Sequence, residues 1–444
     1  MKRVLLWLGG VVAVVGIAVL GMLGWLVSQP GPTAFAKGTP VDLARYTGPS
    51  PAGVPAELAQ ADLLARGRYL TDAADCQACH TAKGGTPFAG GRPFVLPFGT
   101  LYAPNITPDP ETGIGKWSDA DFLKAVHKGI APDGTRLYPA FPYASYTMLT
   151  DADVLAIKAY LFSLKPVRLE TKPNTFRFPY NQRWLMTFWS AFFNSDKRFQ
   201  PIPEQSPQWN RGAYLVEASA HCGECHSPRN LMQAMNTRQK FAGGQAEGWN
   251  AYNITPDRVS GIGAWSAQDL AAYLARGHAV GRGTASGPMR EAVELSLSKM
   301  TPGDIAAMVT YLQSVPAIRS SQLPEMAGPA PAAPKSGPTG NPMGKRLFEG
   351  NCASCHAWNG HGALVQEAQL TGSRAVNDVT ATNVAQMILN GAGTSTSARP
   401  YMPSFASAYT DREIAAVSNY VTARFGSKPS SITPGKVAEL RAQN

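Results

Sequence analysis

The spacing of apolar residues along the chain predicts helices in three segments that are built alike. Runs at helical spacing follow a serine and acidic residues at 118–121 and at 266–269, and later helices follow Thr150, Thr301 and Thr410. Serine and threonine favour the start of a helix because their side chains accept its free backbone N–H groups, and acidic residues favour its first turn. The pattern predicts an all-α fold made of repeated helical units.

Two of these segments are copies of each other. Residues 105–109 and 253–257 both read Asn-Ile-Thr-Pro-Asp, and Gly-Ile-Gly-Lys-Trp at 113–117 corresponds to Gly-Ile-Gly-Ala-Trp at 261–265. The third segment is shorter and keeps only the outline. We therefore expect two duplicated domains followed by a third, related one.

Each repeat opens on a helix that carries a glycine and closes on a helix that carries a tyrosine. A glycine lets a second helix approach closely, so we expect the two helices to cross there and to close a pocket. The glycines are Gly67, Gly212 and Gly344, and the tyrosines are Tyr160, Tyr311 and Tyr420.

The boundaries of the repeats follow from these patterns and from shifts in composition. The first repeat covers 55–165, the second 207–318 and the third 343–426, with an amino-terminal segment 1–36, linkers 166–206 and 319–342, and a carboxyl-terminal tail 427–444. The second linker is rich in Pro, Ala, Gly and Ser, which is typical of an extended tether. The third repeat is therefore expected to be the most mobile.

The first linker is dense in aromatic residues, which is unusual for a connecting segment. Its sequence at 184–193 is Trp-Leu-Met-Thr-Phe-Trp-Ser-Ala-Phe-Phe. Three interpretations are open: packing within the chain, contact with a partner or a membrane surface, and a pocket for a quinone.

The amino terminus carries a long uncharged apolar run. Residues 4–27 contain no charged residue, and this length exceeds the ~20 residues that cross a bilayer as a helix. The apolar region of a cleaved signal is usually only ~7–15 residues, which favours a retained membrane anchor, although Ala34 to Ala36 offers a cleavage site. Lys2 and Arg3 precede the run, so the positive-inside rule places the rest of the chain outside the cytoplasm.

The composition is that of a globular protein with a modest positive charge. Of the 444 residues, 44% are apolar and 16% charged, and the formal net charge is +10 at pH 7. The sequence lacks the runs of arginine and lysine interleaved with aromatic residues that bind a phosphate backbone, so no nucleic-acid partner is expected. It also shows no paired-carboxylate, nucleophile or glycine-rich phosphate signature, and we expect no catalytic residues.

All six cysteines fall in three copies of one pentapeptide, Cys-x-x-Cys-His, one in each repeat. The motif is typical of c-type haem attachment, in which both thiols form thioethers to the porphyrin and the histidine is the proximal ligand of the iron. A zinc site, a redox pair or a disulfide is the alternative for one isolated copy, but zinc would need a second pair of ligands nearby. We expect three haem c groups, attached at Cys76 and Cys79, Cys222 and Cys225, and Cys352 and Cys355, with His80, His226 and His356 as iron ligands.

A methionine opposite the histidine would suit electron transfer, because it favours reduced iron and raises the potential. The candidate should lie between the second helix of a repeat and its last helix. In the third repeat Met402 lies 11 residues after Gly391, and in the second Met289 lies 12 residues after Gly277. Both are predicted to be iron ligands, with Met300 as the alternative in the second repeat.

The first repeat departs from this register. The residue 12 positions after Gly129 is Phe141, which cannot bind iron. Met148 is the nearest substitute and is the predicted ligand. His127 would instead give a bis-histidine haem of lower potential, although a lone histidine on a helix is usually a surface residue, and a haem with an open sixth position is the third option. The remaining histidines are expected to be structural or surface groups; they are His221, His278 and His361.

Taken together, these features resemble one family. The three haem motifs in one chain, the apolar amino terminus, the repeated Asn-Ile-Thr-Pro, the sequence Leu-Tyr-Pro-Ala-Phe-Pro-Tyr at 137–143 and the aromatic linker are similar to the triheme cytochrome c subunits of membrane-bound dehydrogenases. The resemblance implies three class I cytochrome c domains in tandem plus an N-terminal membrane helix. Phe141 is a departure, because many relatives are expected to carry methionine there.

The resemblance also implies a function and partners. In that family the subunit takes electrons from a separate dehydrogenase catalytic subunit, which carries pyrroloquinoline quinone, flavin or a molybdenum cofactor. It passes them to ubiquinone or the respiratory chain. The implied location is the cell inner membrane, on its periplasmic side.

Two other classes of function stay open. A haem enzyme with an open first site, such as a peroxidase, would bind carbon monoxide and turn over without a partner. A cytochrome subunit of a terminal oxidase would instead accompany an oxidase subunit.

Overall fold

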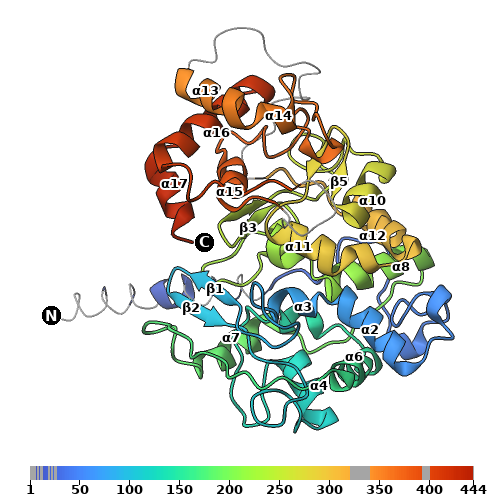
Figure 1. The fold of residues 1–444 in the computed structure, drawn as a ribbon. Coiled ribbons are helices and arrows are strands. Elements are labelled where there is room, and N and C mark those ends of the chain that lie inside the picture. Colours follow the sequence, from blue (N-terminus) through green and yellow to red (C-terminus); the bar gives the residue numbers. More distant parts are fainter. Residues whose placement is uncertain are drawn as a thin grey trace.

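The three repeats lie in a stack, with the second between the first and the third (Figure 1). The computed structural model describes residues 28–320, 341–392 and 401–443, together with scattered residues among the first 27. The first repeat is drawn in blue to teal and the third in orange and red, at opposite ends of the stack. The order of the repeats in space thus follows their order in the sequence.

Each repeat is built mainly from helices around a short helical turn at its Cys-x-x-Cys-His motif. The first contains α2 (Leu63–Ala73), α3 (Cys76–Cys79), α4 (Asp119–Lys128), α5 (Tyr143–Tyr146) and α6 (Asp151–Ser163). The second contains α8 (Pro207–Tyr214), α9 (Gly223–His226), α10 (Ala267–Arg276), α11 (Pro288–Leu295) and α12 (Pro302–Ser314). The third contains α13 (Pro342–Asn351), α14 (Ala353–His356), α15 (Thr382–Asn390) and α16 (Asp411–Phe425), followed by α17 (Pro434–Arg441). The first linker holds α7 (Leu185–Phe193).

Short elements complete the repeats. The antiparallel strand pairs are β1 (Pro93–Leu96) with β2 (Gly99–Tyr102), β3 (Gly244–Ala246) with β4 (Trp249–Ala251), and β5 (His278–Ala279) with β6 (Gly283–Thr284). The 3-10 turns are η1 (Leu43–Arg45), η2 (Ala56–Leu58), η4 (Thr237–Gln239), η5 (Leu297–Lys299) and η6 (Gln366–Ala368). A π-helical turn, η3 (Leu215–Ser219), continues α8 toward the second motif.

The helix starts predicted from serine and threonine are confirmed. The Ser118 side chain accepts the N–H of Asp121, and the Asp121 carboxylate accepts the N–H of Ser118, which is a reciprocal cap that recurs at Ser266 and Thr410. α6 and α12 begin with simpler threonine caps. Such a cap satisfies a free backbone donor and contributes ~1 kcal/mol to stability. The local sequence thus sets where these helices begin.

The opening and closing helices of each repeat cross at a glycine, as predicted. A Cβ atom on Gly67 of α2 would lie 2.0 Å from the carbonyl oxygen of Ala156 in α6 and 2.9 Å from the Cβ of Tyr160. The same clash would occur at Gly212 against α12 and at Gly344 against α16, at 2.0 and 2.2 Å. Because no side chain fits at such a distance, only glycine allows these helices to pack so closely.

The first and second repeats hold each other through exchanged tyrosines. The hydroxyl of Tyr69, on α2 of the first repeat, donates to Asp304 at the start of α12 in the second, at 2.6 Å, and accepts a backbone N–H there at 3.2 Å. Tyr214 of the second repeat does the same at the start of α6, where it donates to Asp153 at 2.5 Å. All four side chains are buried. Each repeat therefore completes a helix cap of the other.

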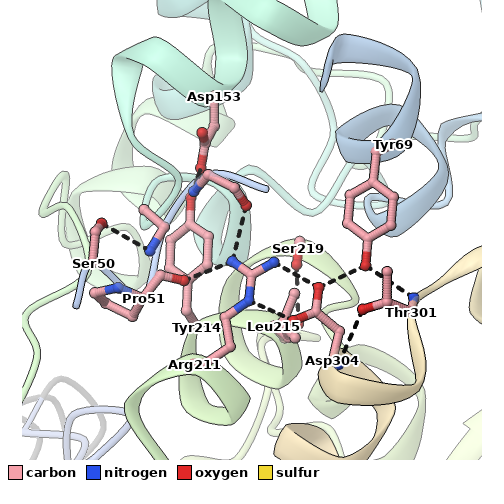
Figure 2. A network of polar contacts seen from close by, with 12 residues as sticks. Ser50, Pro51, Tyr69, Asp153, Arg211, Tyr214, Leu215, Ser219, Thr301 and Asp304 are labelled. Carbon is pink, nitrogen blue, oxygen red and sulfur yellow. Dashed lines mark hydrogen bonds and ion pairs between the residues drawn. The ribbon is translucent and has the colours of Figure 1, made fainter. Parts of the chain in front are cut away.

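An arginine extends these contacts into a network, which Figure 2 shows. The guanidinium of Arg211 donates to the Asp304 carboxylate at 2.6 and 2.8 Å and to the carbonyl oxygens of Pro51 and Gly53. Burial lowers the pKa of Arg211, but the hydrogen bonds and charge of Asp304 outweigh it, so the pKa lies above its usual value. A buried charge is tolerated when all its hydrogen-bonding partners are present. Loss of either Arg211 or Asp304 would leave the other as an unpaired buried charge.

The apolar cores match this arrangement. One core runs through the first and second repeats, and a separate core fills the third repeat around Phe348 and Phe425. α17 belongs to the third core, because its Val437 and Leu440 are buried there. The helix within the expected tail is therefore part of the third repeat.

The first linker packs against the first repeat with some of its aromatic residues and exposes others. Its backbone runs along β2, and Trp189 of α7 is buried against Tyr143. Trp184, Phe188 and Phe192, at successive turns on the other face, are exposed. The predicted packing within the chain is thus confirmed for part of the linker, and contact with a partner, a membrane or a quinone stays a prediction for the exposed part.

The third repeat is docked on the second, although the sequence predicted it to be the most mobile. Where β4 meets the start of α15, Asn250 and Asn383 exchange two hydrogen bonds of 2.8 and 2.9 Å. Both side chains are buried. The tether predicted at 319–342 lies mostly outside the described residues, and the mobility of the third repeat stays a prediction.

The predicted fold class needs two corrections. The described chain is not purely α-helical, because short strand pairs accompany the helices. No described helix is long and apolar enough to cross a membrane, so the predicted N-terminal membrane helix is not found. Most of the apolar run at 4–27 lies outside the described residues. The end of the 1–36 segment is part of the folded body, because Phe35 packs against Trp209 and Tyr311, a contact that an apolar run cannot indicate.

Substitution of Gly344 tests the helix crossing. Gly344→Ala puts a methyl group 2.2 Å from the carbonyl oxygen of Ala416, so the free energy of unfolding of the third repeat should fall by ~1–3 kcal/mol. Gly350, on the same helix α13, has no atom within 4 Å of its Cβ position, and Gly350→Ala is the matched control. Thermal unfolding followed by circular dichroism measures both variants. Equal midpoints for the two would contradict the crossing.

Removal of the Tyr69 hydroxyl tests the exchange between the first two repeats. Tyr69→Phe leaves the buried Asp304 carboxylate one donor short, so the free energy of unfolding should fall by ~1–3 kcal/mol, and Tyr214→Phe should have a similar effect. Tyr180, whose ring is exposed, supplies the control variant Tyr180→Phe. Urea unfolding compares the three. A Tyr69→Phe protein as stable as the control would show that the exchanged tyrosines do not hold the repeats together.

Candidate haem attachment sites

Each Cys-x-x-Cys-His motif lies at a short helical turn that follows the opening helix of its repeat. α3 spans both cysteines of the first motif, and α9 and α14 run to the histidines of the second and third. Residues three apart on a helix point to the same side, so each turn presents its two thiols together. No cysteine is joined to another in a disulfide. Both sulphurs of every motif are therefore available for a thioether bond.

The histidine that ends each motif is held in the same way in all three repeats. Its Nδ1 lies within hydrogen-bond distance of a backbone carbonyl oxygen. The distances are 2.7 Å from His80 to Pro104, 2.6 Å from His226 to Tyr252 and 2.7 Å from His356 to Ala368. A carbonyl oxygen only accepts, so Nδ1 carries the proton and Nε2 keeps its lone pair. The bond fixes the plane of the ring, so each imidazole offers Nε2 as a ligand in a set orientation.

Burial keeps these imidazoles and the sulphurs of the first two motifs uncharged. It lowers the pKa of His80, His226 and His356 below the usual value, and the carbonyl hydrogen bonds oppose this only in part. The neutral imidazole is the form that binds a metal. Burial also raises the pKa of Cys79 to about 12 and that of Cys225 to about 11. An uncharged sulphur, such as that of a thioether, suits both places.

These donor sets fit covalently attached haem. A haem c supplies one-electron chemistry at its iron when it is bound. Its attachment requires two neighbouring thiols and one histidine with a free Nε2, and each repeat supplies all three. In the part of the chain that the structure describes, no cluster of His, Cys, Asp and Glu side chains could hold a free metal ion.

The first and second sites are neighbours across the interface of their repeats. The hydroxyl of Ser145, in α5 of the first repeat, donates to the carboxylate of Glu224, between the two cysteines of the second motif, at 2.9 Å. The ring of His221, directly before the second motif, lies 5.3 Å from the ring of Tyr146 in the first repeat. The two attachment turns thus meet at the interface that the exchanged tyrosines hold.

A set of charged side chains lies between these two sites, and no sequence pattern predicts it. Arg92 of the first repeat donates to the carbonyl oxygen of Ala78, between the first two cysteines. It also donates to the carboxylates of Glu247 and Glu291 in the second repeat, at 2.9 and 2.5 Å. Burial, and then the charge of Glu291, raises the pKa of Asp75 to about 7. These residues come from separate elements of two repeats, so no spacing in the sequence marks them.

The two methionines in register lie beside the cores of their repeats. Met289 is in the first turn of α11, partly buried against the core that the first and second repeats share. Met402 is partly buried against the third core, and its backbone exchanges hydrogen bonds of 2.8 and 2.9 Å with Ala392, just after α15. Met300, the alternative in the second repeat, is buried before α12. Iron ligation by Met289 and Met402 stays a prediction.

The first repeat has an aromatic residue at the corresponding place. Phe141 is partly buried, and its ring lies 5.6 Å from the ring of Tyr146. Met148 is buried in the shared core. His127 is buried as well, not on the surface, with Nδ1 3.7 Å from Asp151 at the start of α6. Burial lowers the pKa of His127 to about 4, so its ring is neutral. The choice among Met148, His127 and an open position stays a prediction.

Sequence similarity to known proteins identifies the family. The family model for cytochrome c matches residues 64–165 and 343–424, within the first and third repeats. The chain is 36% identical to the fructose dehydrogenase cytochrome subunit of Gluconobacter japonicus, over 90% of this chain and 86% of that protein. It is also 36% identical to the gluconate 2-dehydrogenase cytochrome c subunit of Pantoea cypripedii, over 85% of this chain and 89% of that protein.

A third relative is a longer protein. This relative, one of the subunits of nicotinate dehydrogenase from Pseudomonas putida, is 39% identical over 99% of this chain, but the chain spans only 36% of the length of that protein. The two cytochrome subunits, in contrast, match over most of both chains. The chain therefore belongs to the family of cytochrome c subunits of dehydrogenases.

Proposed function

We propose that this electron-transfer cytochrome carries three haem c groups and serves a dehydrogenase complex. The observation that carries the proposal is the threefold repetition of one arrangement. In each repeat two free thiols at a helical turn precede a histidine whose Nδ1 donates to a backbone carbonyl oxygen. The family supports the same function, because its members are cytochrome subunits of dehydrogenases.

The proposed electron donor is a separate catalytic subunit. The relatives are named for dehydrogenases of fructose, gluconate and nicotinate, so the substrate differs from one member to another. A donor with pyrroloquinoline quinone, flavin or a molybdenum cofactor fits this role equally well. The sequence of this chain has no nucleophile or paired-carboxylate signature, and we therefore assign substrate oxidation to the partner.

The proposed acceptor is ubiquinone or another component of the respiratory chain, on the periplasmic side of the bacterial inner membrane. Haem of the c type is attached outside the bacterial cytoplasm, which supports this location. The exposed aromatic residues Trp184, Phe188 and Phe192 support a contact between the first linker and a partner or membrane surface.

The residues of the chain have two tasks in this function. The thiol pairs fix where each haem is attached, and the carbonyl oxygens fix how each ligand histidine is turned. Tyr69 and Tyr214 hold the first two attachment turns at a constant separation. Electron transfer between two groups depends steeply on that separation, so a rigid interface serves the function directly.

A haem enzyme is the second candidate, and Phe141 is the observation that favours it. An aromatic side chain occupies the position at which the other repeats carry methionine. The first iron would keep an open position if neither Met148 nor His127 binds it. Such a protein would bind carbon monoxide at neutral pH and consume a small substrate without a partner.

Removal of the third motif tests the number of haem groups. The double substitution Cys352→Ala and Cys355→Ala should lower the haem content from three to two per chain, because the third repeat has its own thiol pair and its own core. Ser354→Ala, between the two cysteines, is the control and should keep the full content. The pyridine haemochrome spectrum per mole of protein measures both. The same haem content in the two variants would refute a haem at this site.

Substitution of Met148 tests the sixth ligand of the first haem. Met148→Ala should abolish about one third of the weak near-infrared absorption of methionine-ligated iron, because one of three such bonds is lost. Met232→Ala, which changes a methionine packed near α7, is the control and should leave the band intact. An unchanged band in Met148→Ala would exclude this ligand. Binding of carbon monoxide by the unaltered protein would then indicate the open site.

A further inference from the structure

The interface between the second and third repeats is built around the carbonyl groups that hold two of the histidines. The carbonyl oxygen of Tyr252 accepts from His226 at 2.6 Å, and that of Ala368 accepts from His356 at 2.7 Å. Tyr252 directly follows β4, and Ala368 ends η6. β4 lies against the third repeat, and η6 lies against the second. The contacts between these repeats are therefore next to the two residues whose carbonyl oxygens accept from the histidines.

The side chain of Tyr252 reaches into the third repeat. Its hydroxyl donates to the Asp378 carboxylate at 3.0 Å, and the Arg374 guanidinium lies 4.8 Å from the centre of its ring. The phenol is the donor in this contact, and it joins the second repeat to the third.

Asp378 is a rigid anchor for this contact. It is fully buried, and the oxygen that binds Tyr252 also accepts from the Asn250 side chain at 2.9 Å. Its other oxygen accepts the N–H and the hydroxyl of Thr380, at 2.9 and 2.7 Å. A buried carboxylate with these bonds cannot shift without leaving donors unpaired, which costs more than a hydrogen bond contributes. Tyr252 is therefore tied to a fixed point.

The carbonyl group that holds the third histidine is likewise restrained by contacts with another repeat, in this case the second. The residues on both sides of Ala368 bond to the β5–β6 hairpin of the second repeat. The Thr284 hydroxyl donates to the carbonyl oxygen of Glu367 at 2.9 Å. The N–H of Gly281 donates to the side chain of Gln369 at 3.1 Å. Docking thus restrains the carbonyl partner of the third histidine through its backbone neighbours.

The first site differs from the second in this respect. Pro104 takes the place of Tyr252 as the partner of His80, and proline has no hydroxyl group with which to bind another repeat. The adjacent strand β2 is covered by the first linker, where the N–H of Thr175 donates to the carbonyl oxygen of Thr100 at 3.0 Å. The duplicated repeats therefore differ at the position where the second faces the third.

We propose that Tyr252 is a positioning residue of the second site. Its hydroxyl is anchored on Asp378, and this fixes the carbonyl group that holds His226. Docking of the third repeat therefore sets the electron-donating strength of that histidine. A histidine that donates a firm hydrogen bond through Nδ1 is a better electron donor through Nε2, and a better donor stabilises oxidised iron. Docking therefore keeps the potential of the second haem low. This inference rests on a haem bound at His226, which the haem content tests separately.

Tyr252→Phe in the full-length holoprotein tests the proposal. The variant removes only the hydroxyl, so the carbonyl group remains but loses its anchor. Spectroelectrochemical titration should show a raised midpoint potential for the second haem and unchanged potentials for the other two. The second haem is identified as the one missing from a Cys222→Ala, Cys225→Ala protein.

Tyr138→Phe is the matched control. The Tyr138 hydroxyl donates to the carbonyl oxygen of Tyr180 at 2.9 Å, so the variant loses one comparable hydrogen bond between a repeat and a neighbouring segment. This bond involves no partner of a ligand histidine. All three midpoint potentials should therefore stay at their original values.

Exchange of the His226 Nδ1 proton gives a direct structural readout, in protein with isotope-labelled histidine. It should be about tenfold faster in Tyr252→Phe, while exchange at His80 is unchanged. If Tyr252→Phe does not fold, Asn383→Ala loosens the same docking from the third repeat. It should also raise the potential of the second haem and speed exchange at His226, while the potential of the first haem stays unchanged. Unchanged potentials and exchange in a variant with full haem content would overturn the proposal, as would an equal shift of all three potentials. Absence of haem at the second site in the unaltered protein would instead contradict the proposed function.

Discussion

The close approach of two helices at a glycine is the constraint on which the rest of the protein depends. In every repeat the opening helix leads into the attachment turn, and the closing helix crosses it where any side chain would clash. The two helices are packed too closely at this contact to shift against each other, so the position of the closing helix is fixed relative to the opening helix. Tyr69 and Tyr214 bind to these fixed helices, because each donates a hydrogen bond at the start of the closing helix in the other repeat.

Two different interfaces join the three repeats, and both lead to attachment turns. The first and second repeats share one apolar core and exchange buried hydrogen bonds, and Tyr146 of the first repeat lies against His221, directly before the second motif. The second and third repeats meet through buried polar side chains around Asp378, which binds the hydroxyl of Tyr252, and the carbonyl group of the same tyrosine orients His226. A protein that passes electrons needs constant distances and oriented ligands more than it needs a substrate pocket. The two interfaces supply both.

The sequence predicted features that depend on residues close together in the chain. Helix starts such as Ser118, the crossing at Gly344 and the three motifs all depend on spacing within one segment. Contacts between repeats could not be predicted in this way. Tyr69 and Tyr214 recur at equivalent positions, but no spacing shows that each binds the other repeat. The composition of the second linker predicts a loose tether, but it carries no information about the surfaces of the repeats that the linker joins. The membrane helix was predicted from the length of the uncharged apolar run at 4–27. The contact between Phe35 and Trp209 shows that the 1–36 segment ends inside the folded body.

The number of electrons that the holoprotein accepts tests the central claim most directly. An anaerobic reductive titration followed by haem absorption should reach its end point at three electron equivalents per chain, one for each Cys-x-x-Cys-His motif. All three should be returned to an oxidant without loss, because the chain is an electron-transfer cytochrome. An end point of two equivalents or fewer, in protein with full covalent haem content, would contradict the account.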